Sequence, residues 1–154
     1  MRQRTRPQAP RWAQVTALLL SVAGLLVSAY LTVEHYSSST PLACPETGVV
    51  DCVKVTTSSY STLVGLPVAL LGLLVFAVMT VLCTPAVRRL ANPWVERVRL
   101  AGSVAGVVMV AYLVWAELFR IDAICLWCTV VHALTVALFA VLVLAAALRP
   151  IDPI

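Results

Sequence analysis

Two cysteines at the start of the last apolar segment have the spacing that most directly indicates chemistry. They belong to the motif Cys125-Leu126-Trp127-Cys128. Side chains three positions apart on a helix share one face, and the free N–H groups of a helix N-terminus favour a thiolate, which is the nucleophilic form. The motif therefore indicates thiol–disulfide exchange. Zinc binding is the other common use of this spacing, but a structural zinc site needs two further ligands.

The composition places these cysteines in a membrane protein. Of 154 residues, 61% are hydrophobic and 12% are charged, and the mean hydropathy is +0.96. Four stretches contain no Lys, Arg, Asp or Glu, and as helices each would approach or exceed a hydrocarbon core of about 30 Å. These stretches are residues 12–33, 63–87, 100–116 and 123–148. We expect an all-α membrane protein that forms a four-transmembrane-helix bundle.

One domain accounts for the bundle. We expect a single transmembrane domain over residues 12–148, with short tails at 1–11 and 149–154. The expected spans are residues 12–33, 63–83, 100–118 and 124–147, and the connection at 34–62 is a polar outer loop. The segment from 84 to 99 is expected to be a cytoplasmic turn, because Pro85 and Pro93 interrupt it.

The distribution of arginine predicts the orientation of the chain. Basic residues gather before the first span, between the second and third, and after the fourth, and these are Arg2, Arg4, Arg6, Arg11, Arg88, Arg89, Arg97, Arg99 and Arg149. By the positive-inside rule these segments and both termini are cytoplasmic. The two other connections, which hold only Lys54 and Arg120 among basic residues, then face outward. Topology explains the positive charge, so nucleic-acid binding is not expected.

This topology sorts the cysteines. Cys44, Cys52, Cys125 and Cys128 fall on the outer side, where disulfides form and persist, whereas Cys83 faces the cytoplasm and is expected to be a buried, inert thiol. A metal site is not expected, because His35 and His132 are the only histidines that could complete one. A bridge between the two loop cysteines could be either structural or exchanging, since so short a loop gains only about 2–3 kcal/mol on closure.

Two pairs of outer cysteines suit an electron relay. A pair on a mobile loop can meet a soluble protein, and a pair fixed where a helix meets the bilayer can address a molecule in the membrane. With no haem, flavin or metal motif visible, a quinone between the helices is the natural electron acceptor. Ser58 lies in a run of hydroxyl residues at 56–62, which also fits a simple helix-capping turn.

The order of these features resembles the vitamin K epoxide reductase family, and most of all its bacterial members. The chain has Cys-x7-Cys, then Ser58 six residues later, then Gly65-Leu66-Pro67, and finally Cys-Leu-Trp-Cys opening the last span. The similarity extends over about residues 20–144. It implies a four-helix bundle around a quinone, with the outer loop folded over it as a cap.

The resemblance also implies a role for each outer cysteine. Cys128 would attack or contact the quinone, and Cys125 would be its partner in the disulfide. Cys52 would exchange with Cys125, and Cys44 would meet the disulfide-forming site of a partner protein.

Other positions follow from the same resemblance. Ser58 matches a serine near the quinone head group, and Trp127 would line the pocket. His132 stands where the vertebrate enzymes have a tyrosine beside the naphthoquinone, so epoxide reduction is not the first expectation, and a core or interfacial imidazole is the simpler role. Many bacterial members carry a fused thioredoxin-like domain. Because this sequence stops at Ile154, we expect its redox partner to be a separate protein.

The sequence thus predicts a quinone-dependent thiol–disulfide oxidoreductase in a cell membrane, namely the bacterial cytoplasmic membrane, with its site on the extracytoplasmic face. It would reoxidise a DsbA-like thioredoxin-fold partner, reduce menaquinone or ubiquinone and support disulfide formation in exported proteins. The alternatives are a vitamin K epoxide reductase, a non-catalytic membrane component with two bracing disulfides, and a metal-binding subunit.

Overall fold

The structure is a bundle of long helices capped at one end. The computed structural model describes residues 9–37, 43–45, 47–89 and 92–148. Within these residues four long helices lie side by side: α1 (Arg11–Tyr36), α3 (Val68–Cys83), α5 (Pro93–Ala116) and α6 (Leu126–Ala147). The shorter elements are α2 (Cys52–Thr56), the 3₁₀ turn η1 (Ser59–Ser61), strands β1 (Thr62–Leu63) and β2 (Leu66–Pro67), α4 (Pro85–Arg89) and the π-helical turn η2 (Glu117–Ile121).

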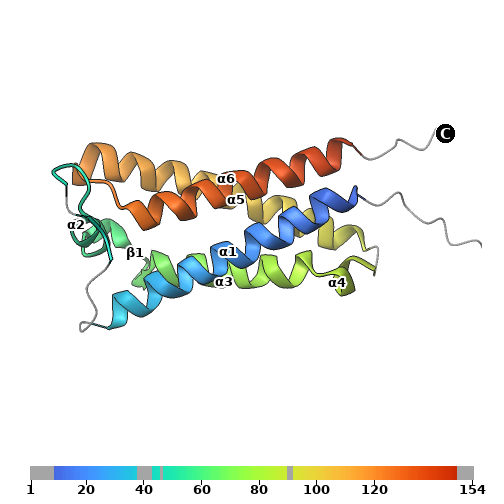
Figure 1. Ribbon diagram of the computed structural model, residues 1–154, viewed down its shortest axis with the longest axis horizontal. Helices are drawn as coiled ribbons and strands as arrows, with labels where there is room; N and C mark the ends of the chain where they lie inside the picture. The colour runs from blue at the N-terminus through green and yellow to red at the C-terminus, as the bar shows by residue number, and fades with distance from the viewer. Residues whose placement is uncertain (1–8, 38–42, 46, 90–91, 149–154) are drawn as a thin grey trace, which may run out of the picture.

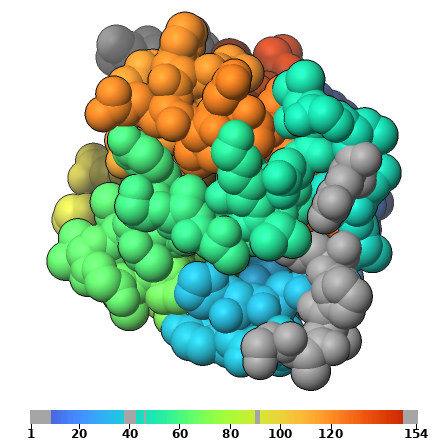
Figure 2. Space-filling model, turned by 90° about the vertical axis from the view of Figure 1, so that its left-hand side faces the viewer, coloured from blue at the N-terminus to red at the C-terminus, as the bar shows by residue number. Residues whose placement is uncertain are grey.

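The two ends of the bundle differ. Helix α1 begins and α6 ends at the end of the bundle that holds α4, whereas α2 and β1 lie at the opposite end (Figure 1). Figure 2 looks onto that opposite end, where the segment running from teal to green spreads between the end of α1 and the α5–α6 connection. The described part of the expected outer loop, residues 43–45 and 47–62, therefore lies across one end of the helices and is called the cap below.

The helices are apolar on their outer as well as their inner faces. Three of them, α1, α6 and α5 continued through η2, are long and apolar enough to cross a membrane, while α3 has 16 residues and is shorter. Large apolar side chains such as Leu19, Leu26 and Val108 are exposed on the outside of the bundle. Lipid is the environment in which such a surface is stable, so the chain is described below as a multi-pass membrane protein.

Small residues bring α1 close to α3. Ser21 and Ser28 are almost fully buried, and a Cβ placed on Gly24 would lie 2.2 Å from Cε1 of Phe76. The ring of Phe76 therefore packs directly against the α1 backbone, as expected where small residues recur every three or four positions. At the end of the bundle near α4, Cys83 is buried as predicted and receives a long contact of 3.8 Å from the Ser21 hydroxyl.

A β-hairpin delays the start of α3. The apolar stretch predicts a span from residue 63, but Thr62–Pro67 pairs in an antiparallel register and α3 begins at Val68. Val64 and Gly65 both have positive φ values, 53° and 81°, which is the combination that a two-residue hairpin turn requires. Hydropathy cannot register this turn, because Val64 is as apolar as the helix that follows.

The third helix begins earlier than its apolar stretch. Instead of an irregular turn up to residue 99, α5 starts at Pro93, and the side chain of Asn92 caps it by accepting a hydrogen bond of 2.9 Å from the Trp94 N–H. Proline is favoured in the first helical turn, so it starts this helix rather than breaking it. Arg99 is buried and pairs with Glu96 at 3.2 Å, which lets a charged turn continue into the apolar helix.

Candidate functional site

The loop cysteines form a disulfide in the cap. Cys44 and Cys52 are bonded to each other, and Cys52 is the first residue of α2. The carboxylate of Asp51 caps this helix by accepting a hydrogen bond of 2.8 Å from the Lys54 N–H. Cys52 is 1% exposed, whereas Cys44 is half-buried, so Cys44 is the more accessible sulfur of the pair.

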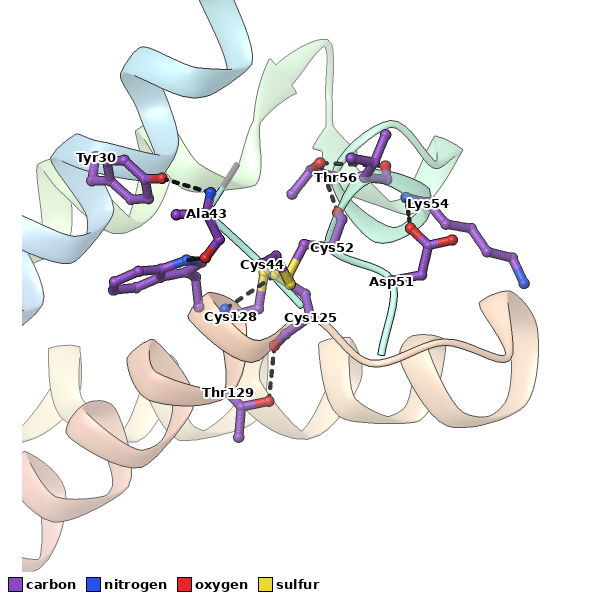
Figure 3. Close-up of a disulfide and its surroundings, with 12 residues drawn as sticks. Tyr30, Ala43, Cys44, Asp51, Cys52, Lys54, Thr56, Cys125, Cys128 and Thr129 are labelled. Atoms are coloured by element: carbon purple, nitrogen blue, oxygen red, sulfur yellow. Dashed lines mark hydrogen bonds between the residues drawn. A yellow bond between two sulfur atoms is a disulfide. The ribbon is translucent and has the colours of Figure 1, made fainter. Parts of the chain in front are cut away.

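Backbone pairing fixes the cap beside the Cys-x-x-Cys motif. The N–H of Asp51 donates to the Ile124 carbonyl at 3.1 Å, and the N–H of Ile124 donates to the Val49 carbonyl at 2.9 Å. The residues that follow these bonds, Cys52 and Cys125, belong to one buried cluster. Figure 3 shows the sulfur atoms of both pairs gathered at this point. The structure thus brings together all four cysteines that the sequence singled out.

The two cysteines of the motif are free thiols in unlike surroundings. Cys125 is fully buried at the N-cap of α6, and its sulfur accepts a hydrogen bond of 3.3 Å from the Cys128 N–H. The pKa of Cys125 is lowered, first by the hydrogen bond from the Cys128 thiol and further by that N–H, against the opposing effect of burial. These hydrogen bonds at the start of α6 therefore ease the loss of the proton from Cys125 rather than from Cys128.

Cys128 faces a cavity between the helices. The cavity has a volume of about 420 Å³ and is lined mainly by apolar atoms from α1, α3, α5 and α6. The cap covers its outer end with Ser58 and Tyr60, and His132 lines the wall below Cys128. An apolar space with a few polar groups at one end is typical of a small-molecule site.

The two non-cysteine residues singled out in the sequence have different positions. Ser58 lines the cavity, and its hydroxyl donates to the Val55 carbonyl at 2.8 Å, which leaves its oxygen as an acceptor. Trp127 is not among the residues that line this cavity. Its indole N–H donates to the Ala43 carbonyl at 3.0 Å, and its ring lies 5.1 Å from that of Tyr30. Trp127 of α6 thus contacts both the cap, at the residue before Cys44, and Tyr30 of α1, and so holds these three parts together.

Sequence reasoning missed Glu117 and Tyr60. Glu117 lies near the outer end of the expected third span, and its side chain is 6% exposed and lines the cavity with Cys128. A single acidic residue that directly follows an apolar span is the signal that could have identified it, since ionisable groups at such depth are costly to bury. Tyr60 accepts a hydrogen bond of 2.9 Å from Arg120, which links the cap to the end of α5.

Among the residues that the structure describes, no three His, Cys, Asp or Glu side chains are placed to hold a metal ion. The polar groups at the cavity are instead one thiol, several hydroxyls, two imidazoles and one carboxyl. This donor set suits a redox reaction of thiols with an organic molecule better than it suits metal coordination.

Comparison with known proteins identifies the family of the chain. The model of the vitamin K epoxide reductase family matches residues 15–143 of the chain. No curated protein matches the sequence. The matched residues include the cap disulfide, the Cys-x-x-Cys motif and nearly all of the four long helices. Because the match covers most of its length, this protein belongs to the vitamin K epoxide reductase family.

Proposed function

We propose that this protein transfers two electrons from a reduced thioredoxin-fold protein outside the cytoplasm to a quinone in the membrane. Members of the family are oxidoreductases that in general work with a quinone and a thioredoxin-like partner. The observation that carries the proposal is the position of Cys125 and Cys128, which lie between a disulfide in the cap and an apolar cavity.

The first half of the relay is thiol–disulfide exchange. A thiolate of the partner attacks the accessible sulfur of Cys44 and releases Cys52, and the second partner thiol then closes the partner's disulfide and frees Cys44. The Cys52 thiolate next attacks Cys125 in the oxidised motif and releases Cys128. Attack by Cys44 on Cys52 restores the cap disulfide and leaves Cys125 and Cys128 as thiols, which is the arrangement in this structure.

The second half is oxidation of the motif by the quinone. Two S–H bonds break, the Cys125–Cys128 disulfide forms, and the quinone takes up two electrons and two protons to become a quinol. The cavity is within the usual 300–1,000 Å³ of ligand pockets, and its apolar wall suits a quinone ring. The Tyr60 hydroxyl accepts from Arg120 and so keeps its own hydrogen to donate to a quinone carbonyl, whereas Ser58 could donate there only by giving up its bond to the Val55 carbonyl. Menaquinone and ubiquinone both fit this description.

Orientation supports an extracytoplasmic site. Arg88 and Arg89 of α4 lie at the end of the bundle opposite the cap, and by the positive-inside rule this supports an extracytoplasmic position for the cap and its cysteines. The oxidised partner would then introduce disulfides into exported proteins. A DsbA-like partner has a potential near −120 mV, so only an acceptor of higher potential can keep it oxidised.

The test is quinone reduction by the purified protein in lipid nanodiscs, with a reduced DsbA-like protein as donor and a short-chain quinone as acceptor. We expect turnover by the wild type and none by Cys128→Ala. Cys44→Ala should fail with the protein donor but still turn over with a small dithiol, because the latter can reach the motif directly. Cys83→Ala is the matched control and should behave like the wild type, since Cys83 lies at the other end of the bundle.

Two results would refute the proposal. One is equal quinone reduction by the wild type and Cys128→Ala. The other is a cap disulfide that stays closed when the reduced partner is added, as expected of a bracing disulfide. Turnover of vitamin K epoxide by the wild type, with no reoxidation of the partner, would support the epoxide reductase alternative instead.

A further inference from the structure

Glu117 is a buried carboxyl at the proposed quinone site. It is the first residue of η2, where a π-helical turn ends the α5 helix, and its side chain lines the cavity together with Cys128. Burying a carboxyl in an apolar wall is costly unless another group compensates. Π-helical turns also occur frequently at functional sites. These features suggest that Glu117 has a function beyond closing a turn.

No cation compensates Glu117 within the described part of the chain. The nearest basic residue along the chain, Arg120, is turned away: its guanidinium donates to the Tyr60 hydroxyl and lies 5.7 Å from the centre of the Trp115 ring. Lys54 is directed at the carbonyl of Asp122 at 3.5 Å. A structural ion pair therefore does not explain the burial of this carboxyl.

Glu117 is instead held against the redox motif. The backbone N–H of Cys125 is close enough to its carboxyl to stabilise negative charge there. In addition, the N–H of Ala123 donates to the Glu117 carbonyl at 3.2 Å, which folds the α5–α6 connection back onto η2. Asp122 makes this reversal in the left-handed region, with a φ of 54°. One carboxyl thus borders both Cys125 and the cavity.

The proposed reaction needs a proton carrier at this position. Reduction of a quinone to a quinol consumes two protons, and the two thiols release two when their disulfide forms. Cys128 lines the cavity and can deliver its proton directly, but Cys125 is fully buried behind it and is not among the residues that line the cavity. The Cys125 proton must cross from this sulfur to a quinone oxygen.

We propose that the Glu117 carboxyl carries this proton, accepting it from the Cys125 thiol and donating it to the quinone oxygen as the disulfide forms. Atoms and charges balance, because the carboxyl returns to its starting state and the quinol holds both protons. The inference rests on the proposed function. The other titratable groups that line the cavity are His35 from α1, Tyr60 from the cap, and Cys128 and His132 from α6.

The test compares Glu117→Gln with Asp122→Asn. Gln has nearly the shape of Glu and keeps an oxygen that can face the Cys125 N–H, but it carries no transferable carboxyl proton. Asp122→Asn makes the same change of charge on the same connection, at an exposed residue whose left-handed conformation Asn tolerates. The assay follows a single turnover: protein prereduced at Cys125 and Cys128 is mixed with quinone, and quinol formation is measured across a range of pH.

We expect Glu117→Gln to slow quinol formation by about 100-fold or more, the usual contribution of a positioned acid or base. Over part of the pH range, the rate of quinol formation by the wild type and Asp122→Asn should change with pH, and this dependence should be missing in Glu117→Gln. Exchange between the cap disulfide and the motif, measured without quinone, should be unchanged, because that step needs no proton at the quinone. Glu117→Asp should restore part of the rate.

The outcomes separate the inference from the proposed function. If the wild type forms no quinol, the proposed function itself fails. If the wild type forms quinol and Glu117→Gln matches it in rate and pH profile, the proton carrier is wrong while the relay stands. If Glu117→Gln impairs cap exchange and quinol formation equally, Glu117 only positions the motif, and the inference is overturned. Loss of this pH dependence in His132→Gln, but not in Glu117→Gln, would assign the role to His132.

Discussion

At the residue scale, Cys125 and Cys128 are inequivalent although they are identical in type and close in sequence. Cys125 is at the N-cap of α6, where its sulfur accepts the Cys128 N–H, and Cys128 is in the first turn and faces the cavity. The division suits a relay, because one sulfur must meet Cys52 and the other the quinone. Their positions at the N-terminus of α6 are thus sufficient to give Cys125 and Cys128 different partners.

This inequivalence makes a prediction for the Cys125 thiol. The largest cause of its lowered pKa is the hydrogen bond from Cys128, so Cys128→Ala should raise the pKa of Cys125. Cys125 would then form its thiolate only at higher pH. The ultraviolet absorbance of thiolate, followed against pH in a Cys83→Ala background with the cap disulfide closed, measures this shift. An unchanged titration in Cys128→Ala would show that the helix N-terminus alone sets the pKa.

At the element scale, the close contact of α1 with α3 depends on Gly24. Ala at this position would place its Cβ 2.2 Å from Cε1 of Phe76. In the same way, a Cβ on Gly102 of α5 would lie 2.3 Å from Cε of Met79. With either Cβ present, the Phe76 ring or the Met79 thioether would have to move. Both contacts lie along the inner face of α3, so this helix is fixed between neighbours on either side.

We therefore expect Gly24→Ala to destabilise the protein by about 1–3 kcal/mol, the usual cost of overpacking, less whatever is gained from the higher helix propensity of Ala. Thermal unfolding in detergent micelles measures the effect. Phe76→Leu in the Gly24→Ala background should recover part of the loss, because it removes the ring that Ala displaces. Leu26→Ala on the exposed face of the same helix is the control and should change stability less.

At the scale of the whole molecule, the cap and α6 must meet for electrons to pass between the two cysteine pairs. They meet because the Val49–Asp51 segment pairs with Ile124, and because Trp127 binds the Ala43 carbonyl on the other side of Cys44. Figure 3 shows Tyr30 of α1 joined to Ala43 as well, so three parts of the chain hold the cap disulfide over the motif.

This arrangement predicts a trapped intermediate. In the double variant Cys44→Ala/Cys128→Ala, Cys52 and Cys125 have lost their usual partners but remain in one buried cluster. They should form a disulfide with each other, detectable by mass spectrometry of the digested protein. Cys83 is the internal control and should stay reduced, because it is buried near the opposite end of the bundle. A double variant with three free thiols would contradict the proposed transfer from Cys52 to Cys125.

The sequence by itself determined that this is a helical membrane protein of the vitamin K epoxide reductase family, with two pairs of cysteines able to work together. Hydropathy, charge and motif spacing depend on neighbours along the chain, so a sequence can carry them. Only the tertiary structure decided that α3 begins after a hairpin, that Trp127 holds the cap, and that Glu117 is buried beside Cys125. The hairpin depends on the positive φ of Val64 and Gly65, and the other two outcomes depend on contacts made when the chain folds back on itself, none of which hydropathy or motif spacing records.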